Sequence, residues 1–126
     1  MTVAVFGVGI DLASVARVKQ AIERYGGRFL ERVFTPNEVA FCAKLSHPYP
    51  SYAARFAAKE AFSKALGTGL RGKISWREVE VCDNERTRPM LKVSGRAKEI
   101  LGGRRVHLSL THLDDYAAAV VVIEDE

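Results

Sequence analysis

An acidic and a basic side chain stand one helical turn apart, ahead of a glycine-rich loop. Glu60 and Lys64 lie in a stretch of good helix formers, so both project from one helix face. Gly67-Thr68-Gly69 follows and could offer bare backbone N–H groups and a hydroxyl to an anion. Together these groups suit a metal-bound phosphate ester. The same pattern also describes a surface ion pair before a helix cap, since Gly67 stands where a left-handed cap would fall.

A second carboxylate, Asp11, follows an apolar stretch near the start of the chain. Residues 3–10 read as a buried strand, and the glycines at 7 and 9 indicate that another element approaches its backbone closely. Asp11 would end this strand, which is a common place for a metal ligand. It could equally be the N-cap of a helix over residues 12–25, because Asp accepts the first free N–H groups of a helix. The pattern leaves both roles open.

Signals for helices lie mainly in the first half of the chain and signals for strands in the second. Thr35-Pro36-Asn37-Glu38 has the composition of a capping box, and its helix should end near Leu45. Ser51 would cap the helix that carries Glu60. After the glycine loop we expect strands at 79–82, 90–93, 106–111 and 116–124, turns at 83–89 and 112–115, and a short helix at 95–101. This distribution predicts an α+β fold.

Length and composition fit one domain over residues 1–126, with 48% hydrophobic residues to build its core. We find no apolar run long enough to cross a bilayer, and no basic region precedes the apolar N-terminal residues as in an export signal. Cys42 and Cys82 lack CxxC spacing, which favours reduced thiols over a structural zinc site. We therefore expect a cytoplasmic protein that does not associate with membranes.

The net charge of +4 and the pI of about 9.3 favour an acidic partner. Arg17 and Arg24, seven residues apart, share a face of the first predicted helix, and Arg28 follows closely. Such a face is either solvated or a docking surface for an acidic helix. A nucleic-acid-binding domain would explain the charge. It would not explain Asp11 and Glu60, and no exposed aromatic run suits base stacking, so we expect no nucleic acid partner.

Three segments, taken together and in order, resemble one known family. They are Gly9-Ile10-Asp11-Leu12, then Phe56-Ala57-Ala58-Lys59-Glu60-Ala61-Phe62-Ser63-Lys64-Ala65-Leu66-Gly67-Thr68-Gly69, and finally His107-Leu108-Ser109-Leu110-Thr111-His112 with Ala117-Ala118-Ala119-Val120. The set resembles holo-acyl-carrier-protein synthase, the short bacterial branch of the 4′-phosphopantetheinyl transferases, over essentially the full chain. Each segment alone is weakly specific, whereas all three at fitting separations form a specific signal.

The resemblance implies an enzyme that moves 4′-phosphopantetheine from coenzyme A to a serine of apo-acyl carrier protein. The reaction would depend on Mg²⁺, release adenosine 3′,5′-bisphosphate and serve fatty acid biosynthesis. Asp11 and Glu60 match the family's metal ligands, and Lys64 matches a lysine that contacts a coenzyme A phosphate, so these three would be the catalytic residues. The resemblance also implies a homotrimer with an antiparallel sheet and with coenzyme A bound between subunits.

The remaining site residues follow from the same resemblance. Gly67, Thr68 and Gly69 would let the backbone approach the nucleotide, and Arg55 and His112 would contact phosphates. Arg17, Arg24 and Arg28 would meet the acidic helix of the carrier protein.

Two points stay open at this stage. The proton of the attacking serine could go to a metal-bound water or hydroxide or to a carboxylate, with Glu60 the first choice among side chains. A non-catalytic nucleotide-binding or assembly protein of the same fold would retain all three segments, so only an activity assay separates it from the enzyme.

Overall fold

A computed structural model of the chain describes residues 4–82 and 88–126. Within these residues the strands form two antiparallel sheets. A three-stranded sheet has the order β1 (Val5–Ser14), β5 (Tyr116–Glu124), β4 (Arg105–His112), and β2 (Val79–Cys82) pairs with β3 (Met90–Val93). The predicted α+β class is confirmed, and the last strand, β5, lies between β1 and β4 in the larger sheet.

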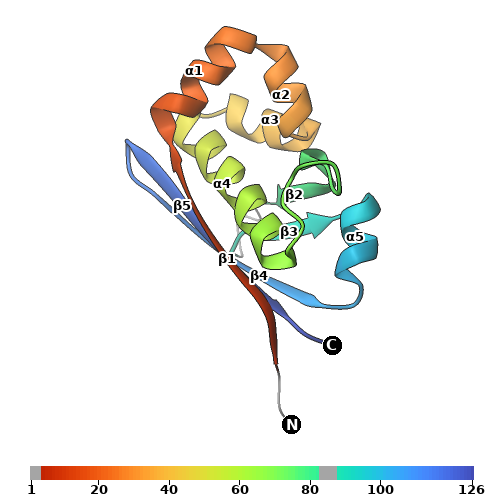
Figure 1. Cartoon of the computed structure of the whole chain (residues 1–126). Coiled ribbons are helices and arrows are strands. Elements are labelled where there is room, and N and C mark those ends of the chain that lie inside the picture. The colour runs from red at the N-terminus through yellow and green to blue at the C-terminus, as the bar shows by residue number, and fades with distance from the viewer. Residues whose placement is uncertain (1–3, 83–87) are drawn as a thin grey trace.

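One long helix lies against the three-stranded sheet, and the shorter helices lie near its start or beside the two-stranded sheet (Figure 1). The helices are α1 (Val15–Tyr25), α2 (Gly27–Val33), α3 (Pro36–Ala43), α4 (Tyr49–Leu66), α5 (Gly95–Leu101) and the 3-10 helix η1 (Trp76–Glu78). The helices α1, α2 and α3 cluster near the start of α4, and the two-stranded sheet lies near its end. Over the described residues, no helix has the length and apolar character needed to span a membrane.

The glycines of β1 allow α4 to pack directly on the strand backbone. A Cβ atom built on Gly7 would lie 1.9 Å from the Ala65 carbonyl oxygen, and one on Gly9 would lie 1.9 Å from the Ala61 carbonyl oxygen. These separations are far inside van der Waals contact, so only glycine fits at either position. The prediction that another element approaches this backbone is confirmed, and the close contact brings the neighbouring Asp11 toward α4.

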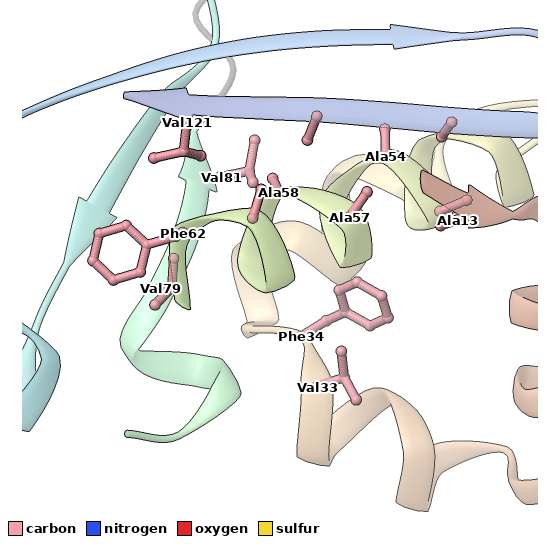
Figure 2. Packing of buried hydrophobic residues seen from close by; sticks show 14 of the residues in the cluster. Ala13, Val33, Phe34, Ala54, Ala57, Ala58, Phe62, Val79, Val81 and Val121 are labelled. Carbon is pink, nitrogen blue, oxygen red and sulfur yellow. The ribbon is translucent and has the colours of Figure 1, made fainter. Parts of the chain in front are cut away.

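The core is built around the small apolar residues of α4 (Figure 2). Ala57, Ala58 and Phe62 are fully buried between the three-stranded sheet on one side and other apolar side chains on the other. Those side chains include Phe34 ahead of α3 and Val79 of β2. Because its core contacts lie on several sides, α4 holds a fixed place relative to both sheets.

The first helix begins later than predicted. β1 continues through Asp11 to Ser14, and its pairing with β5 runs from Val5 to Ser14. Ser14 is the N-cap of α1, and its hydroxyl accepts a hydrogen bond from the Arg17 N–H at 3.2 Å. The N-cap role considered for Asp11 is therefore wrong, because pairing with a strand a hundred residues away overrides the local cap signal.

Several other element predictions can be compared with the structure. The capping box of Thr35 and Glu38 is confirmed. Ser51 does not cap α4, which begins at Tyr49; its hydroxyl instead accepts from the Arg55 guanidinium at 2.7 Å. The helix α2 was not predicted, and Tyr25 at the end of α1 is exposed. The polar turn expected between the second and third strands falls mostly on residues outside the described part of the chain.

The two cysteine thiols both donate hydrogen bonds, as expected of reduced cysteines. The Cys42 thiol donates to the Ser51 hydroxyl at 3.4 Å, and the Cys82 thiol donates to the Glu80 carboxylate at 3.5 Å. Burial raises the pKa of Cys82, which keeps that thiol protonated.

Candidate active site

Asp11 and Lys64 meet where β1 crosses α4. Asp11 shares the α4-facing side of β1 with Gly9 and Ala13. The Lys64 ammonium donates to Asp11 Oδ1 at 2.9 Å and to the Ile10 carbonyl oxygen at 3.1 Å. The hydrogen bond to Asp11 raises the pKa of Lys64, so this lysine stays charged. Two of the three predicted catalytic residues are thus in direct contact, although 53 positions separate them in the sequence.

Glu60 brings a second carboxylate to the same place. Its side chain is half-buried, and burial raises its pKa, as does the nearby negative charge of Asp11. The positive charges of Lys64 and Arg71 act in the opposite direction but do not cancel the rise. The two carboxylates therefore interact unfavourably with each other, and a cation placed between them would relieve that repulsion.

A hollow of about 510 Å³ opens beside these groups. Its walls come from α4, from the loop that follows α4, and from α2. The lining residues are Arg32, Glu60, Ser63, Lys64, Thr68, Gly69, Leu70, Arg71 and Trp76. With three cationic side chains around one half-buried carboxylate, this reaction hollow suits an anion accompanied by a metal ion.

The glycine loop differs from the prediction in one respect. The N–H groups of Gly67, Thr68 and Gly69 all donate to the Ser63 carbonyl oxygen, at 3.0, 3.1 and 3.3 Å. The expectation that these three groups are bare is wrong, because they close the C-terminal turn of α4. Gly67 has φ 88°, so the predicted left-handed cap is confirmed. Thr68 and Gly69 remain in the wall of the reaction hollow.

Arg55 and His112 lie in a different hollow, of about 500 Å³. Arg55 is buried, and its guanidinium lies 4.4 Å from the centre of the Phe41 ring. His112 ends β4 and is exposed. Within one copy of the chain, the structure therefore does not bring these two predicted phosphate contacts into the hollow of Glu60 and Lys64.

The three predicted docking arginines are all exposed. Arg17 and Arg24 lie on α1, and Arg28 on α2 lines a third hollow with Tyr25, Phe29 and Arg32. Because Arg32 also lines the reaction hollow, the basic surface of α2 runs directly into that hollow.

Arg71 and Trp76 were not singled out from the sequence, yet both line the reaction hollow. Arg71 stands two residues beyond the glycine loop, which was the available signal for it. Trp76 is the only tryptophan in the chain, and its ring stacks on Phe56 with the ring centres 4.8 Å apart. No local pattern indicated that Trp76 would return to α4.

The pair of carboxylates fits Mg²⁺ better than a metal that needs a complete protein cage. Among residues 4–82 and 88–126, no group of three or more His, Cys, Asp or Glu side chains could hold a metal ion. Mg²⁺ commonly takes one or two protein carboxylates and completes its octahedron with water and substrate phosphates. Asp11 and Glu60 supply that number.

Comparison with known proteins gives matches along nearly the whole chain. A model described as the 4′-phosphopantetheinyl transferase superfamily matches residues 7–121. The chain is 45% identical to the holo-[acyl-carrier-protein] synthase of Koribacter versatilis (strain Ellin345) over 124 residues, which is 96% of this chain and 99% of that protein. The identity to the synthase of Chlamydia trachomatis serovar D is also 45%, over 119 residues, 94% of this chain and 99% of that one.

Solved structures of similar proteins share the fold. A synthase from Bacillus anthracis str. Ames, crystallised in complex with CoA (3′,5′-ADP), superposes with a TM-score of 0.83 at 35% identity and covers 99% of this chain and 100% of that one. The synthase from Helicobacter pylori in complex with coenzyme A gives a TM-score of 0.81 at 30% identity, over 92% of this chain and 98% of that one.

Proposed function

The chain belongs to the 4′-phosphopantetheinyl transferase superfamily and is an enzyme of that family, and from this premise we propose that it acts as a holo-acyl-carrier-protein synthase. In the proposed reaction, the hydroxyl of a carrier-protein serine attacks the β-phosphorus of coenzyme A. A new P–O bond forms to the serine, the P–O bond to the nucleotide breaks, and adenosine 3′,5′-bisphosphate leaves.

The observation that supports this proposal most is the meeting of Asp11, Glu60 and Lys64 at the edge of one hollow. We assign Asp11 and Glu60 as the ligands of Mg²⁺, which would supply charge neutralisation and orientation of the diphosphate. Lys64 has a side chain 51% exposed, so its ammonium can reach a phosphate oxygen on the leaving side. Among side chains, Glu60 is our assignment for acceptor of the serine proton, because it is the carboxylate that lines the reaction hollow.

The carrier protein would dock on the basic face of α1 and α2. Arg17, Arg24 and Arg28 are exposed there, and Arg32 leads from this face into the reaction hollow. Carrier proteins of this class are acidic, so the net charge of +4 would speed their association with the enzyme. We place the reaction in the cytoplasm, as the composition of the chain indicates, and in fatty acid biosynthesis, as the resemblance implies.

The active form would be a homotrimer with each site between two copies. The face of β1 turned away from α4 exposes Val8, Ile10 and Leu12 at 59%, 64% and 65%. We propose that a second copy covers this apolar face. The neighbour would also bring its own Arg55 and His112 to the nucleotide, since one chain holds them in a separate hollow.

Intact-mass spectrometry of an apo-acyl carrier protein tests the proposal. Incubation with the chain, coenzyme A and Mg²⁺ should add about 340 Da, the mass of the phosphopantetheine arm expected for this phosphoryl transfer. The variant Asp11→Ala, as a matched control, should leave the carrier unmodified. A carrier of unchanged mass with the unaltered chain would contradict the proposal. Binding of coenzyme A without transfer would instead identify a non-catalytic nucleotide-binding protein.

A further inference from the structure

Lys59 directly precedes the proposed metal ligand Glu60, but its side chain is entirely buried in the core. An ammonium group is costly to bury unless all of its hydrogens have acceptors. The reaction proposed above uses Glu60 and Lys64 and leaves Lys59 without a role.

Three acceptors surround the Lys59 ammonium, one for each of its hydrogens. Glu38 Oε1 lies 2.8 Å away, and the Glu38 side chain is as fully buried as that of Lys59. The ammonium also donates to the Trp76 carbonyl oxygen at 3.1 Å and to the Val79 carbonyl oxygen. One side chain of α4 is thus bound to α3, η1 and β2.

The Glu38 carboxylate is fixed by two further hydrogen bonds from backbone N–H groups. Its Oε1 accepts from the Thr35 N–H at 2.9 Å, and its Oε2 accepts from the Val81 N–H at 2.8 Å. These bonds fix Glu38 between the start of α3 and strand β2. Lys59 therefore contacts a rigid acceptor and not a mobile surface carboxylate.

These contacts determine where the loop after α4 returns. The loop leaves the helix at Gly67, where three N–H groups close on the Ser63 carbonyl. It comes back at Trp76, whose carbonyl accepts from Lys59 and whose ring stacks on Phe56 of α4. Between these two attachments the loop supplies one wall of the reaction hollow. Glu60 and Lys64 lie in the wall that α4 supplies.

We propose that Lys59 is a positioning residue, which holds residues 67–76 against α4 and thereby sets the shape of the reaction hollow. The catalytic part of this inference depends on the proposed function. Stability alone does not require a buried ion pair at this place, because uncharged residues of similar volume often stabilise a fold equally well. Lys59 differs from such a replacement in its bonds to the Trp76 carbonyl, where the loop ends, and to the Val79 carbonyl of β2.

Three variants separate positioning from stability. Glu38→Gln removes the charge partner but keeps the Lys59 bonds to Trp76 and Val79. Lys59→Met removes those bonds and leaves Glu38 charged and unpaired in the core. The double variant Lys59→Met/Glu38→Gln removes the bonds without leaving a buried charge. Since Trp76 is the only tryptophan, quenching of its fluorescence by acrylamide reports the exposure of the loop directly.

The thermal midpoint should depend on whether a buried charge is left without a partner. The exposure of Trp76 and the kcat should depend on whether Lys59 is present. Each single variant should melt lower by roughly 10 °C or more, and the double variant should recover most of that loss. Both variants that lack Lys59 should show stronger quenching of Trp76. Their kcat should fall roughly 10- to 100-fold, as expected when reacting groups are misplaced. Glu38→Gln, measured below its melting temperature, should keep the original quenching.

A double variant with the original quenching and the original kcat would overturn the proposal and leave Lys59 a purely structural residue. If Lys59→Met does not fold, the double variant and Glu38→Gln still give the comparison. If the unaltered chain transfers nothing, the proposed function fails, while the quenching measurements still decide whether Lys59 holds the loop.

Discussion

At the scale of single residues, Glu60 is a proposed metal ligand, and its ionised side chain also lowers the stability of the fold. Burial and the charge of Asp11 raise its pKa, so the folded chain binds the Glu60 proton more tightly than the unfolded chain does. Ionisation of Glu60 therefore lowers stability as the pH rises from below the unfolded pKa to above the folded pKa. The destabilising effect is therefore larger at neutral pH than in acid.

The variant Glu60→Gln should accordingly melt at a higher temperature than the original chain at pH 7, and it should be inactive in the transfer. The gain should disappear below roughly pH 4, where the unfolded chain's glutamates are also protonated. Thermal melts of both chains between roughly pH 3.5 and 7.5 measure this gain in melting temperature. Glu99→Gln removes an exposed carboxylate on α5 and is the matched control. The difference in melting temperature between Glu60→Gln and the original chain should be larger at pH 7 than at pH 4. A smaller or negative difference at pH 7 would contradict the prediction that ionisation of Glu60 destabilises the fold.

The sequence allowed the meeting of Asp11, Glu60 and Lys64 to be predicted better than the surroundings of these residues. Glu60 and Lys64 are close because they share a helix face, and the resemblance added Asp11. Arg71 and Trp76 escaped prediction because a loop without periodic structure brings them back to α4. The bare N–H groups expected at Gly67 to Gly69 were wrong, because the closing turn of α4 uses them.

At the scale of elements, the contact between β1 and α4 places Asp11 beside Lys64 and Glu60. Gly7 and Gly9 have no room for a methyl group, since the helix carbonyls of Ala65 and Ala61 occupy that space. Any side chain here would push the strand away from the helix. The spacing of the two carboxylates would then change together with the stability of the fold.

Gly9→Ala should therefore lower the free energy of unfolding by about 2 kcal/mol, as overpacking in a core does, and reduce kcat as well. Gly27→Ala is the control: nothing lies within 4 Å of the added methyl, and alanine favours the helix α2. Urea denaturation of both variants measures the difference. A Gly9→Ala variant as stable and active as Gly27→Ala would show that the close contact is not needed.

Local signals predicted elements where the determinants are local and failed where they are not. The capping box of Thr35 and Glu38 and the left-handed Gly67 depend on neighbours in sequence, and both were found as expected. β1 runs four residues beyond the predicted end because β5 pairs with it from the far end of the chain. The helix α2 begins at Gly27, directly after the glycine that ends α1, and two adjacent glycines are a signal for the end of a helix and not for the start of another.

At the scale of the whole molecule, the outer face of the three-stranded sheet is the main apolar surface left exposed on β1. Val8, Ile10 and Leu12 all point away from α4. Apolar residues gathered in this way indicate contact with another protein surface. The proposed trimer would cover them and would bring the hollow of Arg55 and His112 in one copy to the reaction hollow of another.

Sedimentation should give a particle of three chains of 13.9 kDa each. Ile10→Glu should sediment as a single chain and bind coenzyme A weakly, because a charge on this face opposes burial while the Ile10 carbonyl still accepts from Lys64. Met90→Glu introduces the same charge at an exposed apolar residue of β3 and should leave the assembly intact. A monomeric original chain with full transfer activity would contradict the trimer.

The central claim is that Asp11 and Glu60 together hold one divalent cation beside a diphosphate. Anomalous diffraction from crystals grown with coenzyme A and Mn²⁺, as a detectable substitute for Mg²⁺, tests it most directly. The account predicts one Mn²⁺ peak at each site, bonded to a carboxylate oxygen of Asp11, to one of Glu60 and to the diphosphate. Bound coenzyme A with no Mn²⁺ peak between these two carboxylates, or with its diphosphate remote from both, would contradict the account.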